Sequence, residues 1–138
     1  MQTFLPYPDF IESARSLDRM RLGKQRVEAK QVHLALTVPN YGWRHHPAVV
    51  MWRGHVDLLV RYGVAVCGVW RSRGYRDTLL DYFMSAPVVG DGHIDPPWLG
   101  DPAFHISHQS NLIRKLPSHY APQFPNVPDN LPYVWPSP

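Results

Sequence analysis

Residues 47–74 read PAVVMWRGHVDLLVRYGVAVCGVWRSRG, and this stretch decides the fold class. Its apolar residues recur at the 3.6-residue spacing of one helix face, and no part of the chain alternates apolar and polar residues as a half-buried strand does. Pro47 suits the first position of a helix, and Gly74 suits its C-terminal end. We therefore predict an all-α protein whose longest helix begins close to Pro47, although three internal glycines weaken or kink it. The apolar face consists of Val49, Trp52, Val56, Leu59, Val66 and Trp70.

The sequence before this stretch predicts two more helices. Asp9 and Glu12 have the spacing of a capping box, so a short helix should begin near Phe10. Residues 17–37 are expected to form a longer helix, because their apolar residues return every three to four positions. The stripe in this helix consists of Leu22, Ala29, Val32 and Leu36.

The sequence after it predicts short helices and a tail. A short helix is expected at 78–83 and another at 103–115, with a proline-containing loop at 86–102 between them. Pro117 should end the second of these helices. Residues 116–138 contain seven prolines and several aromatic residues, which predicts an extended tail that packs on the surface.

Length and composition point to one small domain. The chain has 138 residues, which is enough to bury a hydrophobic core. Its first ten residues have no basic region like that of a signal peptide, and no apolar run approaches the roughly 18–20 residues that span a bilayer. Cys67 is the single cysteine, which excludes an intrachain disulfide and fits a cytoplasmic protein. We expect a monomer with a single domain over residues 1–138 and no membrane segment.

Basic residues are concentrated in two parts of the chain. All fourteen Lys and Arg lie within residues 15–76 or at Arg114 and Lys115, although the net charge is only +3. Segment 13–30 alone carries six basic residues against two acidic ones. Such a stripe suits a polyanion such as nucleic acid, but a solvated helix face has the same composition. Composition by itself leaves both interpretations open.

Glu28 is the one carboxylate in the basic run RLGKQRVEAKQ at residues 21–31. On a helical wheel it lies within about 20° of Arg21, beside Gln25 and at the edge of the apolar stripe. One interpretation is an ordinary i,i+4 ion pair with Lys24, worth a few tenths of a kcal/mol. The other is a catalytic acid or base that is partly desolvated and surrounded by cations. Spacing alone does not choose between them.

The eight histidines raise the question of a metal site. His105 and His108 have helical spacing and could supply two ligands, but no third ligand is identifiable, and neither an HExxH motif nor a cysteine cluster is present. We therefore predict no metal and no cofactor. The histidines fit contacts to DNA, or hydrogen bonds in the core, at least as well.

Several segments together resemble the pyrimidine-dimer DNA glycosylase family, the small bacteriophage endonuclease V type and its bacterial relatives. The resemblance begins with LDRMRLGKQRVE at 17–28, where the family has a basic helix with an Arg-Glu pair whose glutamate is catalytic. It continues with GWRHHPAV at 42–49 and RSRGY at 71–75. It resumes with HISHQSNLIRK at 105–115, similar to a late His/Ser helix with DNA-contacting basic residues, and an aromatic-rich tail is also shared. The similar segments cover most of residues 1–120.

The resemblance implies a compact all-α enzyme that binds damaged duplex DNA, flips a nucleotide out, and acts as an N-glycosylase and abasic-site lyase. The α-amine, here that of Met1, would attack the sugar C1′ and leave a Schiff base, from which β-elimination cuts the strand. An α-amine has an ordinary pKa of about 8 against about 10.4 for lysine, so more of it is unprotonated at neutral pH. Glu28 matches the family glutamate and would orient the sugar or move protons at it. Contacts to double-stranded DNA are expected from Arg21, Lys24, Arg26, Arg44, His45, His105, His108, Arg114 and Lys115.

Two departures from the family pattern leave alternatives open. Gln2 is too bulky for removal of Met1, where the family exposes a small residue, so the amine route and a hydrolytic route remain possible. Val27 separates Arg26 from Glu28, so either Arg21 or Arg26 could match the family arginine. A glycosylase for another modified base, a non-catalytic DNA-binding module and a metal-dependent hydrolase are the competing functions. The sequence does not identify the base that is excised.

Overall fold

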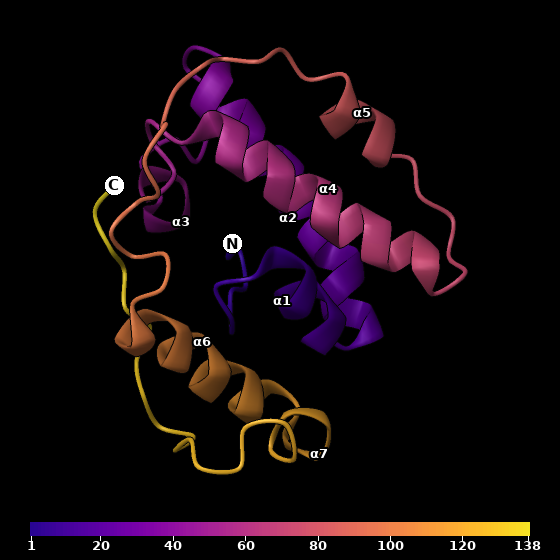
Figure 1. Ribbon diagram of the computed structural model, residues 1–138, viewed down its shortest axis with the longest axis vertical. Coiled ribbons are helices and arrows are strands. Elements are labelled where there is room, and N and C mark those ends of the chain that lie inside the picture. The colour runs from indigo at the N-terminus through magenta and orange to yellow at the C-terminus, as the bar shows by residue number, and fades with distance from the viewer.

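The computed structural model describes residues 1–138, and all of its regular elements are helices. The all-α prediction is therefore confirmed. Figure 1 shows their arrangement. The helices are α1 (Phe10–Ser16), α2 (Arg19–Thr37), α3 (Pro47–Val50), α4 (Val56–Ser72), α5 (Leu80–Met84), α6 (Pro102–Lys115) and α7 (Pro117–Tyr120).

Helix α4 is the centre of the packing. Helices α1, α2 and α5 all pack against it, while α7 packs against α6. In Figure 1 the amino terminus lies in the middle of the molecule, with α1, α2 and α4 on one side and α6 on the other. The first residues of the chain are therefore an internal part of the fold.

The helix expected to begin near Pro47 is divided in two, and α2, with 19 residues, is the longest helix instead. The first piece ends at Val50, and Gly54, in the turn that follows, adopts a left-handed conformation with a φ of 77°. Helix α4 then begins at Val56, where the carboxylate of Asp91 accepts the N–H of Val56 at 3.0 Å and that of Asp57 at 3.3 Å. The prediction was wrong because this cap comes from a residue 35 positions away, which no local pattern reveals.

Most other helix ends follow the sequence. Asp9 accepts the N–H of Glu12 at 2.8 Å and caps α1 as predicted. Gly74, with a φ of 89°, follows the end of α4. The helix expected at 78–83 begins two residues later as α5, and Pro117 opens the unexpected turn α7 after α6 has ended. A proline suits the first turn of a helix, which explains α7.

The largest buried side chains of the core are aromatic, and one glycine allows a close helix contact. A side chain at Gly63 would place its Cβ 2.4 Å from the ring of Phe83, so the glycine lets α5 pack directly on α4. No helix combines the length and the apolar character that crossing a bilayer requires. The largest fully buried aromatic side chains are Trp52, Trp98, Tyr62, Tyr120, Phe83 and Phe104.

The residues after α7 lie along α6. Arg114 donates to the carbonyl oxygen of Leu131 at 2.8 Å, and the Oγ of Ser107 accepts the N–H of Val134 at 3.1 Å. The ring of Tyr133 packs edge-on against that of His108, with centroids 5.5 Å apart. In Figure 1 the end of the chain runs from α6 toward α3.

Candidate active site

The first six residues pass between α2, α4 and α6, which hold their backbone (Figure 1). Leu5 donates its N–H to Nδ1 of His108 at 2.9 Å, and its carbonyl oxygen accepts from Nδ1 of His105 at 2.8 Å. Gln109 donates to the carbonyl oxygen of Pro6 at 2.8 Å. Because both histidine rings are buried and hold this segment, we no longer expect His105 and His108 to contact DNA.

Gln25 connects the N-terminal segment to Glu28. Its Oε1 accepts the N–H of Phe4 at 2.9 Å and the hydroxyl of Tyr62 at 2.6 Å. Its Nε2 donates to the carbonyl oxygen of Gln2 at 2.9 Å and to Oε2 of Glu28 at 2.8 Å. The side chain is 1% exposed, and both donors and both acceptor positions of its amide are used. Gln25 is thus held rigidly between the start of the chain and the carboxylate.

A polar cavity of about 290 Å³ lies where these residues meet. Met1 and Glu28 both line it, although 26 residues separate them in the sequence. Three of the predicted DNA-contacting residues, all basic, also line it. The lining residues are Met1, Gln2, Phe4, Arg21, Lys24, Gln25, Glu28, Lys115 and Tyr133.

Opposing effects act on Glu28. Burial raises the pKa of its carboxyl above the ordinary value of 4.5. The amine of Met1, the Lys24 ammonium, the backbone N–H of Gln2 and the Gln25 amide each act in the opposite direction, because they stabilise the ionised form. Burial is the largest effect, so the carboxyl keeps a proton to higher pH than an exposed glutamate.

The simple surface pairing of Lys24 with Glu28 is not formed. The two ion pairs of the structure are Arg21 with Asp18 at 3.2 Å and Arg26 with Asp77 at 2.6 Å. Glu28 is bound by the Gln25 amide instead. The ion pair of the first interpretation is therefore absent, and Glu28 lies in the wall of the cavity.

The structure separates the predicted DNA-contacting residues into groups. Arg21, Lys24 and Lys115 face the cavity, and both lysines are exposed. Arg26 is bound to the buried carboxylate of Asp77 and lies 5.0 Å from the ring of Trp70, so its guanidinium is already occupied. We therefore no longer expect Arg26 to bind phosphate.

The remaining predicted contacts lie away from the cavity wall. Arg114 is occupied by carbonyl oxygens of the C-terminal tail, including that of Leu131. Arg44 and His45 are exposed in the loop before α3 and bind each other at 3.3 Å. Of these residues, Arg44 and His45 are exposed and are not held by the C-terminal tail.

Sequence reasoning missed His46, which lies close to the amine. Burial lowers its pKa below 6.5, and the positive charge of the Met1 amine lowers it further. Its Nδ1 accepts the N–H of Ala48 at 3.0 Å, so in the neutral ring Nε2 carries the proton. Its ring packs against those of Trp43 and Trp135 at 5.9 Å. The repeated histidines at 45 and 46 were visible in the sequence, but nothing there distinguished the second from the first.

Two glutamines and a tyrosine in the cavity wall were also missed as site residues. Gln2 and Gln25 carry no charge and give no motif, so sequence alone offered no signal beyond the place of Gln25 beside Glu28 on the helical wheel. Tyr133 was counted only as part of an aromatic tail. Burial raises the pKa of the Tyr133 hydroxyl to about 12, so it remains a hydrogen-bond donor at neutral pH.

The structure groups no three His, Cys, Asp or Glu side chains in the manner of a metal site. Both Nδ1 atoms of His105 and His108 bind the backbone of Leu5, and Nε2 of His105 accepts the N–H of Gly100 at 2.8 Å. The alternative in which this pair supplies metal ligands therefore has no support in the geometry.

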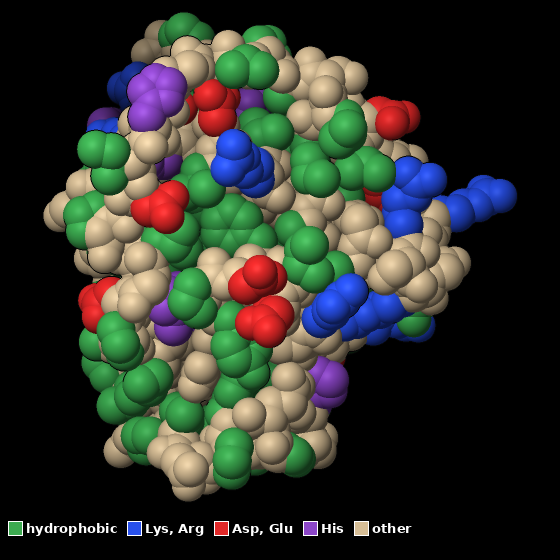
Figure 2. Space-filling model, viewed as in Figure 1, with side chains coloured by type: hydrophobic (Ala, Val, Ile, Leu, Met, Phe, Trp, Pro, Cys, Tyr) green, Lys and Arg blue, Asp and Glu red, His purple; other side chains and the backbone are tan.

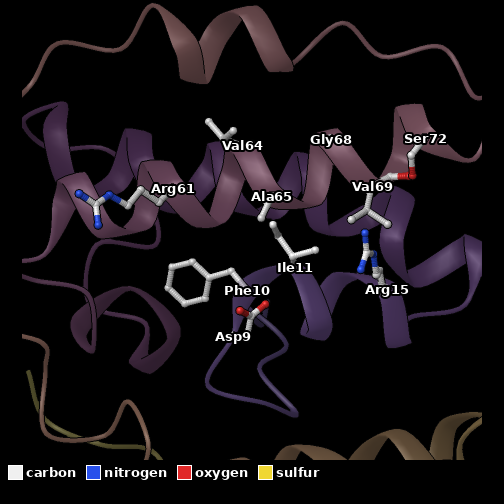
Figure 3. A pocket seen from close by; sticks show the side chains of 10 residues that line it. All are labelled: Asp9, Phe10, Ile11, Arg15, Arg61, Val64, Ala65, Gly68, Val69 and Ser72. Atoms are coloured by element: carbon white, nitrogen blue, oxygen red, sulfur yellow. The ribbon is translucent and has the colours of Figure 1, made fainter.

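A larger cavity of about 560 Å³ lies elsewhere, between α1 and α4. In Figure 3 its walls are mostly apolar, formed by side chains such as Ile11 and Val64, with Arg61 at one end and Arg15 at the other. It contains neither Met1 nor Glu28. Size alone therefore does not identify the reactive site, and the smaller polar cavity is the candidate.

Basic side chains extend over one side of the molecule. On the face shown in Figure 2, most Lys and Arg side chains gather toward the end of α4, while Asp and Glu are scattered over the rest. Arg71, Arg73 and Arg76 are exposed at the end of that helix. Such a distribution attracts a polyanion over a wider area than the cavity itself.

Comparison with known proteins identifies the family of this chain. The sequence model of the family described as pyrimidine dimer DNA glycosylase matches residues 1–82, which include Met1, Gln2, Gln25 and Glu28. No curated protein and no solved structure matches the chain. Since the matched segment is more than half of the chain, the resemblance seen in its motifs is confirmed. The chain belongs to the pyrimidine dimer DNA glycosylase family.

Proposed function

We propose that this protein removes damaged pyrimidines from duplex DNA and then cuts the resulting abasic site, using the amine of Met1 and the carboxylate of Glu28. The observation that carries the proposal is their common cavity, which also contains Lys24 and Lys115. A nucleophile, a proton-transferring group and phosphate-binding cations are the three things that this reaction needs in one place.

The amine supplies the electrons for the first step. Its lone pair forms a bond to C1′ of the flipped nucleotide, and the pair of the C1′–N1 bond leaves with the pyrimidine. Loss of a proton from the attached nitrogen and opening of the C1′–O4′ bond give the Schiff base. Removal of a proton from C2′ then expels the 3′-phosphate and cuts the strand.

Glu28 is assigned the proton transfers at O4′ and C2′. A general acid or base works best when its pKa lies near the operating pH. Burial moves the pKa of Glu28 in that direction, and the hydrogen bond from Gln25 holds one carboxylate oxygen in place. The second oxygen is then the one directed at the sugar.

DNA binding is assigned to the basic residues around the cavity. Lys24 and Lys115 are exposed and free of ion pairs, and Arg21 lies between the cavity and Asp18. The exposed Arg44 and His45 would extend the contact along the duplex. Phosphate contacts of this kind position the strand without reading its sequence.

Borohydride trapping tests the proposed chemistry directly. The protein is incubated with a duplex that contains one abasic site, in the presence of borohydride, and a covalent protein–DNA adduct is expected. The matched control carries two additional residues before Met1, which move the amine away from the cavity and should prevent the adduct. If strand cutting or base release occurs without any adduct, the reaction is hydrolytic, with Glu28 activating water. If the duplex is bound but not changed, the protein is a binding module and the proposal is wrong.

A further inference from the structure

Gln2 presents an unused hydrogen-bond donor in the wall of the active cavity. The residue is 6% exposed and lines the cavity with Met1 and Glu28. Its Oε1 accepts the N–H of Thr3 at 2.9 Å, which fixes the orientation of the amide, because only the oxygen can accept. Its Nε2 is buried and has no partner.

This donor differs from the other polar groups of the site and of the core. Gln25, in the same wall, uses every donor and acceptor of its amide. Three histidine nitrogens are also buried without a partner, at His33, His55 and His108, but none of these residues lines the cavity. Buried donors are nearly always paired in folded proteins, so an unpaired one on a residue that lines a site calls for a partner in the ligand.

We propose that Nε2 of Gln2 donates a hydrogen bond to the C2 carbonyl oxygen of the pyrimidine whose bond to C1′ is broken. This inference rests on the proposed function and adds to it a residue that contacts the departing base. Gln2 follows Met1 directly in the chain, and in a pyrimidine nucleotide the O2 atom is attached next to N1, the atom bonded to C1′. A group that binds O2 therefore has to lie close to the nucleophile, as Gln2 does.

The hydrogen bond acts on the charge that develops as the base leaves. When the amine nitrogen bonds to C1′, the electron pair of the C1′–N1 bond passes to the pyrimidine and is shared between N1 and O2. A donor placed at O2 stabilises this negative charge more than it stabilises the neutral base. The base then takes up one proton and the attached amine nitrogen loses one, so the step is balanced.

Two substrates separate this role from a structural one. Gln2→Met removes the donor, keeps a side chain of similar length and is bulky enough to retain Met1. Single-turnover rates are measured on a duplex with one cyclobutane pyrimidine dimer, scored after alkali, and on the same duplex with a preformed abasic site. We expect glycosidic cleavage of the dimer to slow by roughly 10²-fold, with cutting of the abasic site unchanged because that substrate has no base.

Two further variants control for effects on the fold. Gln2→Glu keeps an oxygen that can accept the Thr3 N–H but has no donor when ionised, and the ratio of the two rates should fall as it does in Gln2→Met. Tyr62→Phe removes the hydroxyl bound to Gln25 and to the carbonyl of Phe4, outside the cavity wall, and should leave that ratio unchanged. If Gln2→Met slows both reactions equally, or neither, the inference is wrong. If the unaltered protein acts on neither substrate, the proposed function fails, and this inference fails with it.

Discussion

Gln25 and Glu28 lie one turn apart on α2, and the Nε2 of Gln25 donates to Oε2 of Glu28 at 2.8 Å. The same nitrogen donates to the carbonyl oxygen of Gln2 at 2.9 Å. One amide thus fixes both the position of the N-terminal backbone at Gln2 and the orientation of the Glu28 carboxylate. This relationship makes Gln25 a positioning residue for the proposed reaction.

Replacement of Gln25 by Met should shift the pH dependence of cleavage. The Gln25 amide stabilises ionised Glu28, so its removal raises the pKa of Glu28 further above 4.5. Proton abstraction by Glu28 needs the carboxylate, and the acidic limb of the rate–pH profile should therefore move to higher pH. Tyr62→Phe is the control, since it disturbs Gln25 but leaves the bond to Glu28.

The charges facing Glu28 are unchanged in this comparison. They are the Met1 amine, Lys24 and Arg21 on α2, and Lys115 on α6, and the neutral hydroxyl of Tyr133 also stays in place. Tyr62→Phe removes only a neutral hydroxyl. A Gln25→Met profile with lower rates but the same acidic limb would show that Gln25 only supports the fold.

Replacement of Glu28 by Gln should separate chemistry from binding. The change keeps the size of the side chain and removes its charge, so cutting of an abasic-site duplex should be abolished. Affinity for the same duplex should stay the same or rise slightly, because a negative charge leaves a basic surface. Gel-based cleavage assays and fluorescence anisotropy measure the two effects. The control Glu12→Gln changes an exposed carboxylate at the start of α1 and should cleave normally. Normal cleavage by Glu28→Gln would rule out a catalytic role for Glu28.

The salt dependence of DNA affinity should become weaker when Lys24 or Lys115 is replaced. Each phosphate contact contributes about 0.9 to the slope of log K against log salt. The variants Lys24→Gln and Lys115→Gln should each reduce the slope by roughly that amount. Lys30→Gln is a suitable control, because its ammonium lies 4.9 Å from the ring of Tyr82 and it does not line the cavity. Equal slopes for all three variants would show that Lys24 and Lys115 do not contact DNA phosphates.

Protein stability should fall in mild acid because of His108. Burial lowers the pKa of this histidine from 6.5 to about 3, with the nearby His105 acting in the same direction. The unfolded chain takes up a proton near pH 6.5 and the folded protein does not, so the unfolding free energy decreases as the pH falls from about 6.5 toward 3. Full linkage to one group amounts to about 1.4 kcal/mol per pH unit.

The variant His108→Asn tests this assignment. Its amide oxygen can still accept the N–H of Leu5, but it does not titrate. Denaturant unfolding at several pH values should therefore show a smaller loss of stability in acid, whereas the exposed His93→Asn should behave as the unaltered protein does. An unchanged acid dependence in His108→Asn would assign the effect to the other buried histidines, His33 and His105.

Several features of this protein were determined by the sequence alone, because they depend on neighbours along the chain. The apolar period predicted the helix at 17–37, a helix was expected at 103–115, and Asp9 predicted the start of α1. The same helical period placed Glu28 beside Gln25, one turn apart. Such features are set by backbone geometry within a few residues, so a local pattern is enough to show them.

Other features were decided by the tertiary structure, because they require residues that are far apart in the sequence. Arg26 looks like part of a DNA-binding stripe, yet it is occupied by Asp77, 51 positions away. The segment at residues 1–6 reaches Glu28 only because side chains of three helices satisfy its backbone, among them His108, 103 positions from Leu5. The backbone N–H and carbonyl groups of residues 1–6 have no backbone partners within this extended segment, and burying them unpaired would cost free energy. The position of the amine beside Glu28 therefore follows from long-range hydrogen bonds, which no pattern of neighbouring residues records.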